Sequence, residues 1–190
     1  MIDLSRTPPG RLPDGFVTAR TGSGAPAEWR VEDDASVVGG HVLTQTGSDR
    51  TDYRFPLAIY ENMSAANVDV TVRFKAVAGR IDRAGGIAIR LADPDNYYVV
   101  RANALEDNVN FYRVAQGARR EIGGASAKVT SDVWHLLGLK AETDTFIISF
   151  DGKVLFTLKD RTFTGPGKVA LWTKADSVTR FDALSIRALP

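Results

Sequence analysis

Residues 85–102, GGIAIRLADPDNYYVVRA, contain two extended runs on either side of a turn signal. The runs Gly86–Ala92 and Tyr97–Leu105 are rich in β-branched and aromatic residues, which favour strands. The segment Asp93–Asn96, DPDN, combines residue types that dominate tight turns. The stretch therefore predicts a β-hairpin.

The same pattern of short runs and turn residues continues along the chain. Asp151-Gly152, between TFIISF and KVLFTL, predicts a two-residue hairpin turn, because such turns need positive φ. Many short strands separated by turns predict an all-β sandwich or barrel. The predicted strands are Gly40–Thr46, Leu57–Tyr60, Val68–Ala76, Gly86–Ala92, Tyr97–Leu105, Val109–Ala115, Arg119–Ile122, Trp134–Ala141, Thr145–Phe150, Lys153–Lys159, Lys168–Lys174 and Thr179–Ala188.

The first 36 residues differ from the rest, since they are rich in Pro, Gly and Asp and show little periodicity. We expect residues 1–36 to form an extended N-terminal arm that packs on the core and is held there by Phe16 and Trp29. A chain of 190 residues suits one domain, so residues 1–190 are expected to form a single β-sandwich domain with this arm.

Composition excludes several function classes. With Lys+Arg 24 against Asp+Glu 23, the net charge of +1 argues against nucleic-acid or membrane-surface binding driven by bulk charge. The absence of cysteine excludes disulfides, thiolate metal sites and cysteine nucleophiles. No apolar run reaches the ~18 residues that a membrane span needs, so neither nucleic acid nor membrane insertion is expected.

The opening MIDLSRTPPGRLPDGF has no apolar core of a signal peptide. We expect a cytoplasmic protein, or a periplasmic or secreted one if a leader was removed.

Alternation along the hairpin predicts that its two arginines share a face. In the first strand the apolar residues at alternate positions, ending with Leu91, point to the core, and Arg90 points away. With Asp93–Asn96 as the turn, Arg101 becomes a diagonal neighbour of Arg90, about 7–8 Å away.

The next hairpin extends this face. If Val109 and Phe111 point to the core, Asn110 and Tyr112 join the arginines, beside Asn103. Planar guanidinium donors suit carboxylates, phosphates and pairs of hydroxyl groups, and these side-chain types are used in sugar recognition. The pattern is also compatible with the ordinary polar outer side of an antiparallel sheet, with the arginines paired to carboxylates.

Two tryptophans lie in predicted strands. Trp134 leads an apolar strand and is predicted in the core. In KVALWTK, Val169 and Leu171 alternate with Trp172, so Trp172 and Lys174 are predicted to point outward, as ligand contacts at the rim of the arginine face.

No catalytic residue is assigned. His41 and His135 are the only histidines, and no G-x-S-x-G turn is present. Glycoside hydrolysis uses two carboxylates across the scissile bond. The acid pairs of this chain, such as Glu106-Asp107, fall in predicted turns and loops, where short acidic side chains bond the local backbone.

The ordered segments WRVEDD, GGHVLTQ, VTVRFK, GGIAIRLADPDNYYVVRA, VWHLLGLKAETDTFIISFDGK and FTGPGKVALWTKADSVTRFDALSI resemble the concanavalin A-like lectin/glucanase superfamily. The resemblance covers nearly the whole chain from Phe16. Within the superfamily the chain is most similar to the bacterial domain class named for 3-keto-disaccharide hydrolases. The resemblance implies a jelly-roll β-sandwich of two curved antiparallel sheets, whose concave face in relatives often receives carbohydrate.

The resemblance has two further implications. Laminarinase- and lichenase-type relatives carry E-x-D-x-x-E on one strand as nucleophile and acid, and this sequence has no such run. Related glucanases often bind calcium through backbone carbonyls near the start and an Asp in the final strand, which Gly40 and Asp182 match here. No cofactor is expected beyond such a structural calcium ion.

We therefore expect a non-catalytic protein that binds an oligo- or polysaccharide on its concave sheet. A glycoside hydrolase or lyase acting on a modified sugar remains open, and it would need two acids that converge from distant strands. A protein-interaction sandwich also remains open, if loops or the arm fill the concave face. The predicted ligand contacts are Arg90, Arg101, Asn103, Asn110, Tyr112, Trp172 and Lys174.

Overall fold

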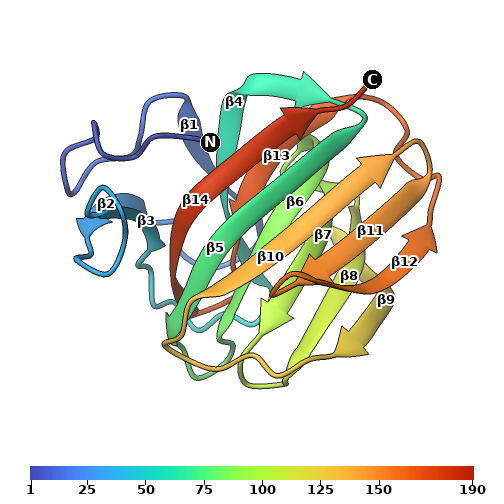
Figure 1. The fold of residues 1–190 in the computed structure, drawn as a ribbon. Coiled ribbons are helices and arrows are strands. Elements are labelled where there is room, and N and C mark those ends of the chain that lie inside the picture. Colours follow the sequence, from blue (N-terminus) through green and yellow to red (C-terminus); the bar gives the residue numbers. More distant parts are fainter.

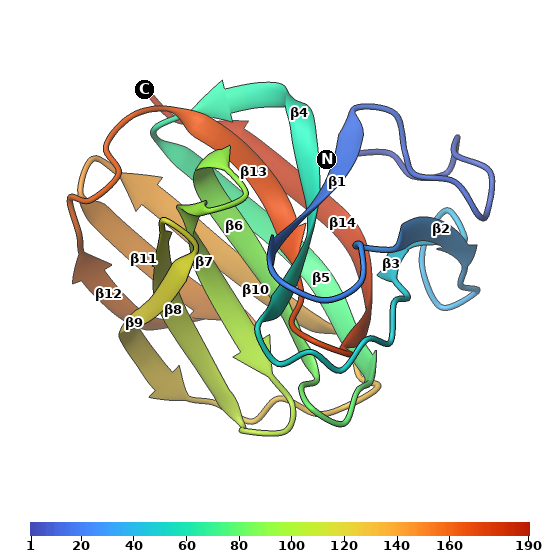
Figure 2. The same ribbon diagram turned by 180° about the vertical axis from the view of Figure 1, so that it is seen from behind.

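The computed structural model describes residues 1–190 and shows two seven-stranded antiparallel sheets packed face to face (Figure 1). The strand order is β1-β4-β13-β6-β7-β8-β9 in sheet A and β12-β11-β10-β5-β14-β3-β2 in sheet B. Sheet B faces the viewer in Figure 1 and sheet A in Figure 2. The predicted all-β sandwich of two antiparallel sheets is confirmed.

Each predicted strand corresponds to one observed strand, with ends that differ by a few residues. Sheet A consists of β1 (Phe16–Gly22), β4 (Arg54–Ala65), β6 (Ala84–Asp93), β7 (Asn96–Asn103), β8 (Asn108–Ala115), β9 (Ala118–Ser126) and β13 (Gly167–Trp172). Sheet B consists of β2 (Trp29–Asp33), β3 (His41–Gln45), β5 (Val68–Ala78), β10 (His135–Glu142), β11 (Thr145–Phe150), β12 (Lys153–Lys159) and β14 (Val178–Ala188).

The N-terminal segment is more regular than predicted, because it contributes one edge strand to each sheet. β1 pairs with β4, and β2 pairs with β3. Phe16 and Trp29, the predicted anchors, begin these strands and are both buried. Sequence alone missed the strands because most of their other residues are polar, so the apolar alternation is short.

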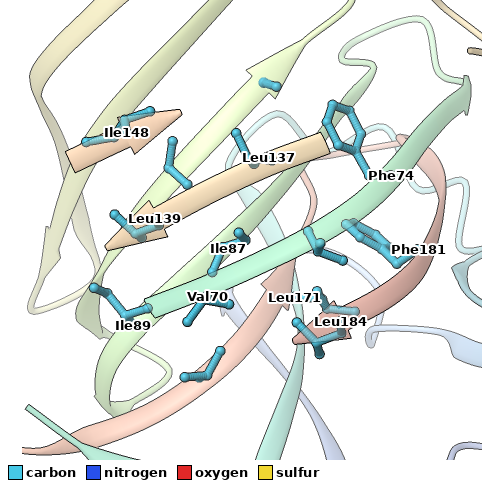
Figure 3. Close-up of a cluster of buried hydrophobic side chains, with 14 of the residues drawn as sticks. Val70, Phe74, Ile87, Ile89, Leu137, Leu139, Ile148, Leu171, Phe181 and Leu184 are labelled. Atoms are coloured by element: carbon cyan, nitrogen blue, oxygen red, sulfur yellow. The ribbon is translucent and has the colours of Figure 1, made fainter. Parts of the chain in front are cut away.

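The main core lies between the sheets and follows strict alternation. Val70 and Phe74 of β5 are fully buried, and the residues between them along the strand are alternately half-exposed. Figure 3 shows these side chains together with Leu137 of the neighbouring strand β10 and Ile87 of β6 in the facing sheet. Burial of one such side chain contributes about 1.5–3 kcal/mol, so this layer fixes sheet A against sheet B.

The predicted tight turn between β11 and β12 is confirmed. Asp151 and Gly152 both have positive φ, 48° and 79°, as a two-residue hairpin turn requires. No helix that is long and apolar enough to cross a bilayer occurs in the structure.

Candidate functional site

The face of sheet A that points away from sheet B, the outer face of sheet A, carries most of the predicted contacts. In the β7–β8 pairing, Arg101 lies opposite Asn110, and Val99 lies opposite Tyr112. Val109 and Phe111 of β8 belong to the main core, so Asn110 and Tyr112 point outward. The prediction that Arg101, Asn110 and Tyr112 share one face is therefore confirmed.

Arg90 does not lie on this face, and its predicted pairing with Arg101 is wrong. Its guanidinium passes toward sheet B, where Nε donates to Ala66 O at 2.8 Å and Nη1 donates to Phe163 O at 2.7 Å. Nη2 donates to Thr143 O, and the guanidinium carbon lies 5.2 Å from the ring centroid of Phe146. All three nitrogens are thus used within the fold, which gives Arg90 a structural role.

A β-bulge in β6 explains the error. The β6–β7 pairing is regular up to Ile89, which pairs with Tyr98. The register then shifts before Asp93, which pairs with Asn96. Arg90 has a φ of 48°, which breaks the alternation. Leu91, predicted in the main core, belongs instead to a second apolar cluster on the outer face.

That second cluster buries Trp172, which was predicted to be an exposed rim contact. Trp172 does point to the outer face, but its exposure is 0%. Its ring stacks on Phe55, and its Nε1 donates to Tyr97 Oη at 3.2 Å. The guanidinium of Arg119 lies 5.8 Å from its ring centroid. Gly86 of β6 lies directly opposite Trp172 of β13, and a Cβ atom on Gly86 would lie 3.3 Å from the indole.

Two hairpin tips fold over the outer face and cover this cluster. Thr21 Oγ1 donates to Pro94 O at 2.5 Å, which fastens the β6–β7 tip to β1. Tyr53 Oη donates to Gly117 O at 2.8 Å and accepts from Arg119 N at 2.6 Å, which fastens the β8–β9 tip beside β4. Part of the predicted ligand face is thus filled by the protein itself.

A charged group occupies the remaining part of the face, around Arg101. Arg101 Nη2 donates to Glu106 Oε2 and to Asn108 Oδ1, both at 2.7 Å. Its Nη1 lies 3.8 Å from Asp82 Oδ2. The side chains of Arg101 and Asp82 are 2% and 1% exposed, so this ion pair is sealed from water.

Lys174 joins the same group, as its predicted outward direction allows. Its Nζ lies 3.3 Å from the buried Asp82 carboxylate and 2.7 Å from the carboxylate of Asp52. We call this group the Arg101 cluster; its members are Asp52, Asp82, Arg101, Glu106, Asn108 and Lys174.

Asp176 holds Asp82 in place. Its carboxylate accepts hydrogen bonds from three successive backbone amides, Arg80 N, Ile81 N and Asp82 N, at 2.9–3.2 Å. Asp82 and Asp176 were missed by the sequence analysis because they lie in loops. Only the folded chain brings Asp82 to Arg101 and Asp176 to the amides of residues 80–82. No local signal distinguishes them from ordinary turn residues.

Burial and neighbouring charges shift the pKa values of the two carboxyl groups nearest Arg101 in opposite directions. Burial raises the pKa of Asp82 above its ordinary value, although Arg101 and Lys174 act against this shift. Burial also acts to raise the pKa of Glu106, but the hydrogen bonds from Arg101 and Asn108 outweigh it and lower that pKa. The cluster thus favours a charged Glu106 at the surface above an Asp82 that is costly to ionise.

Two buried nitrogen atoms in this region have no hydrogen-bond partner within the protein: Arg101 Nε and Asn103 Nδ2. Asn103, another predicted contact, uses its Oδ1 to accept from Leu105 N at 2.8 Å. An unpaired buried polar atom costs about 1–3 kcal/mol, so these two nitrogen atoms beside one ion pair indicate a place where water or a ligand supplies the missing bonds.

Asn110 and Tyr112 form the border between the charged and aromatic parts of the face. Asn110 Nδ2 donates to Glu121 Oε2 at 2.9 Å and to Tyr112 Oη at 3.2 Å. The guanidinium carbons of Arg101 and Arg119 lie 5.5 and 4.5 Å from the centroid of the Tyr112 ring. Asn110 is half-buried and Tyr112 almost fully buried, so Asn110 is the more accessible of the two.

The residues predicted to hold calcium fit that ion poorly. Asp182 Oδ2 is paired with Arg73 Nη1 at 3.1 Å, and a cation there would have to compete with the guanidinium. The carbonyl of Gly40 already accepts from Asp34 N at 2.8 Å. No cluster of three or more His, Cys, Asp or Glu side chains is suited to a metal ion. We derive no function from calcium.

Trp134 was predicted in the core, and this is wrong. It is half-buried outside sheet B, where Arg73 and Lys75 each lie 5.0 Å from its ring centroid. His135, the next residue, is buried, with Nδ1 2.8 Å from Asp151 Oδ2 and Nε2 accepting from Thr130 N at 3.0 Å. Both ring nitrogens of His135 are therefore occupied by structural contacts.

Comparison with solved structures identifies the fold. The carbohydrate binding module CBM66 from Bacillus subtilis has a TM-score of 0.72 and 20% identity, over 92% of this chain and 96% of that one. The β-glucanase of Bacillus licheniformis has a TM-score of 0.60 and 12% identity, over 97% of both chains. The fold is the concanavalin A-like sandwich of lectins and glucanases.

A GH16 protein of Bacteroides ovatus, solved in complex with its G4G4G3G product, has a TM-score of 0.60 and 10% identity, over 84% of this chain and 85% of that one. No protein-family model matches the chain, and no sequence of a curated protein matches it. The superfamily resemblance is thus confirmed as a fold, whereas the narrower likeness to the 3-keto-disaccharide hydrolase class stays a prediction.

Proposed function

We propose that this chain is a non-catalytic carbohydrate-binding protein that contacts an oligo- or polysaccharide at the Arg101 cluster. The observation that carries the proposal is the sealed Arg101–Asp82 ion pair, with the unpaired Arg101 Nε and Asn103 Nδ2 beside it, next to an apolar cluster that the hairpin tips close. Burying charges is costly, so a structural role alone explains such a cluster poorly.

The accessible members of the cluster have the chemistry that sugars need. Glu106 and Asp52 are half or more exposed and present carboxylate oxygens, and the half-buried Asn108 presents an amide. Ile81 and Leu105, each next to a cluster acid in the sequence, are exposed apolar side chains that suit the C–H surface of a sugar ring. In this arrangement Arg101 positions Glu106 and Asn108 from below.

The similar structures support the class of ligand, since one is a carbohydrate binding module and another was solved with an oligosaccharide product. Isothermal titration calorimetry against a panel of oligo- and polysaccharides tests the proposal. We expect binding to at least one glycan, and a loss of about 1–3 kcal/mol of binding free energy in Arg101→Ala. Asn108→Ala, at a half-buried position, should also weaken binding, while Asn67→Ala, in the turn just before β5, should not.

A uniform lack of binding across the panel would refute carbohydrate recognition. Unchanged affinity in both Arg101→Ala and Asn108→Ala would show that the sugar binds elsewhere. Thermal unfolding of each variant shows whether a loss of binding reflects a loss of fold.

An enzyme acting on a modified sugar is the second candidate, and one observation favours it. Asp82 and Glu106, from loops before β6 and after β7, both approach Arg101, and their pKa values are shifted in opposite directions. Asp82 is buried beneath Lys174, however, so a substrate bound at the surface reaches only Glu106. Release of reducing sugar from a bound glycan, abolished by Glu106→Gln, would favour the enzyme over the binding protein.

The third candidate, a protein-interaction sandwich, is favoured by the hairpin tips that fill part of the outer face. A protein-interaction sandwich would have the same fold as the carbohydrate-binding protein, but its function would not require the Arg101 cluster. A glycan panel without any binding would leave it as the better candidate.

A further inference from the structure

The guanidinium of Arg119, in β9, packs against aromatic rings on the outer face of sheet A. Its central carbon lies 4.5 Å from the ring centroid of Tyr112, 4.7 Å from that of Phe55 and 5.8 Å from that of Trp172. A cation over an aromatic ring is attracted by the ring quadrupole, and this contact uses none of the N–H donors of the guanidinium. The rings therefore fix the position of the charge but leave its hydrogen bonds to another group.

Arg119 differs in this respect from every comparable arginine of the chain. It is half-buried, yet its side chain makes no hydrogen bond and no ion pair within the protein. Each of the other buried or half-buried arginines donates at least one side-chain hydrogen bond. Glu121, the next acid along β9, is bonded to Asn110 and does not neutralise Arg119. A half-buried guanidinium without a partner is thus exceptional in this fold.

The unpaired nitrogen atoms of Arg119 are accessible, in contrast to those of Arg101. Nη1 is the only nitrogen of the Arg119 side chain that is sealed without a partner. Because Nε and Nη2 also donate no hydrogen bond within the protein, these two nitrogen atoms reach solvent. Their N–H groups form a planar fork that matches the two oxygen atoms of a carboxylate. In Arg101 the Nε is buried and Nη2 is already paired, so no such fork is free.

An acceptor for a hydroxyl group lies beside the same tyrosine ring. Asn110 donates through Nδ2 to Tyr112 Oη and Glu121 Oε2, whereas its Oδ1 accepts no hydrogen bond and is not sealed from solvent. Gly124 lies opposite Asn110 in the β8–β9 pairing, and a Cβ atom on Gly124 would lie 2.3 Å from this oxygen. The missing side chain at Gly124 therefore leaves Asn110 Oδ1 open to a hydroxyl donor.

We propose that Arg119 binds the carboxylate of an acidic sugar, so that the ligand of this face is a uronate-bearing glycan. This inference rests on the proposed function and names its ligand class. The carboxylate pairs with Nε and Nη2 of Arg119, and a hydroxyl group of the glycan donates to Asn110 Oδ1. A neutral glycan leaves the charge of Arg119 unpaired, and an inorganic anion leaves the hydroxyl acceptor unused.

The proposed contact adjoins the Arg101 cluster. The ring centroid of Tyr112 lies 4.5 Å from the guanidinium carbon of Arg119 and 5.5 Å from that of Arg101. One oligosaccharide that crosses Tyr112 can therefore place its carboxylate on Arg119 and its hydroxyl groups on the cluster. The two sites bind different groups of the same ligand.

Substitutions at two neighbouring arginines separate a specific contact from a general effect of charge. Arg119→Gln removes the charge and the fork, and Arg119→Lys keeps the charge but removes the planar fork. Arg120→Gln is the matched control, because Arg120 is the next residue, is exposed and points to the other side of β9.

Affinity electrophoresis of the full chain tests the proposal, with gels that contain a uronate polysaccharide (polygalacturonate, alginate or glucuronoxylan) or its neutral, carboxyl-reduced form. Salt at about 0.15 M screens attraction between distant charges. We expect wild type and Arg120→Gln to bind at least one uronate polysaccharide about tenfold more tightly than its reduced form. Arg119→Gln should lose this preference but keep its affinity for the reduced form, and Arg119→Lys should lose most of the preference.

The possible failures are distinguishable. Equal retardation of wild type by every uronate polysaccharide and its reduced form refutes the carboxylate contact but leaves carbohydrate binding intact. A preference that survives in Arg119→Gln, with a wild-type thermal midpoint, shows that the carboxylate binds elsewhere. An equal loss in Arg120→Gln shows that the preference reflects net charge alone. No retardation of wild type by any polysaccharide refutes the proposed function and this inference with it.

Discussion

Arg90 and Arg101 come from the two strands of one hairpin and are equally buried, yet their partners differ in kind. Arg90 donates to three backbone carbonyls from three different loops. Arg101 donates to two side chains that reach the surface and keeps its Nε unpaired. Backbone carbonyls in a folded loop cannot be exchanged for a ligand, whereas an exposed carboxylate or amide connects a buried arginine to solvent. Burial of an arginine therefore says less about its role than the partners that it holds.

The largest effect is expected for Arg90→Ala. The change leaves three carbonyl groups in loops around β4, β11 and β13 without their donor, so we expect a loss of about 3–5 kcal/mol in the free energy of unfolding. Urea denaturation measures it, with the exposed Arg187→Ala as a control that should lose about 0.5 kcal/mol or less. A loss below about 1 kcal/mol for Arg90→Ala would contradict its structural role.

Arg101→Ala, alone and combined with Asp82→Asn, should separate the effect of Arg101 on glycan binding from its effect on stability. It removes one partner of a sealed ion pair, so we expect a loss of about 2–3 kcal/mol in unfolding free energy together with the weakened glycan binding. Addition of Asp82→Asn removes the stranded charge and should restore about 1 kcal/mol of stability without restoring binding. Additive effects of the two substitutions on stability would show that Arg101 and Asp82 do not interact.

The pH dependence of stability should have opposite signs at Asp82 and Asp176. Burial raises the pKa of Asp82, so its proton stabilises the folded state at low pH, and this stabilisation is lost as the pH rises through the folded-state pKa. Burial acts to raise the pKa of Asp176 too, but hydrogen bonds from backbone amides outweigh it and lower that pKa. The stabilisation from ionised Asp176 is lost as the pH falls through its folded-state pKa.

Urea denaturation of Asp82→Asn and Asp176→Asn at several pH values, from about 3 to about 7, checks both signs. The stability of Asp82→Asn relative to wild type should rise with pH. The stability of Asp176→Asn relative to wild type should fall with pH. Parallel pH profiles for wild type and Asp82→Asn would mean that Asp82 does not titrate differently on folding.

The smallest effect is expected for calcium. Arg73 already pairs with Asp182 at 3.1 Å, so added calcium should change the thermal midpoint by less than about 1 °C. Scanning calorimetry with calcium and with chelator measures this. A calcium-dependent rise of several degrees would support the calcium site that the family resemblance implies.

Twelve of the fourteen strands were predictable because each of them repeats a local pattern. Alternation along β8 and β13 assigned Val109, Phe111 and Leu171 to the core correctly. The turn at Asp151-Gly152 was predictable because positive φ restricts the residue types that fit. Alternation and turn type depend only on residues that are adjacent in the sequence, so they can be recognised from the sequence of one chain.

The candidate site was predictable only in part. Arg101, Asn110 and Tyr112 were placed on one face correctly, since no bulge interrupts the pairing of β7 with β8. Arg90 was misplaced, because one residue with positive φ in β6 reverses the alternation beyond it. Nothing in the residues around Arg90 indicates this bulge.

The sequence by itself determined the all-β fold, the positions of twelve of the fourteen strands and the faces of the strands that run without interruption, because side-chain alternation is a short-range property of the backbone. Only the tertiary structure decided what covers each face. The hairpin tips that bury Trp172 and the loop that brings Asp82 to Arg101 depend on contacts between residues far apart in the chain. Such contacts follow from how the strands twist and pack together, and no local pattern encodes them.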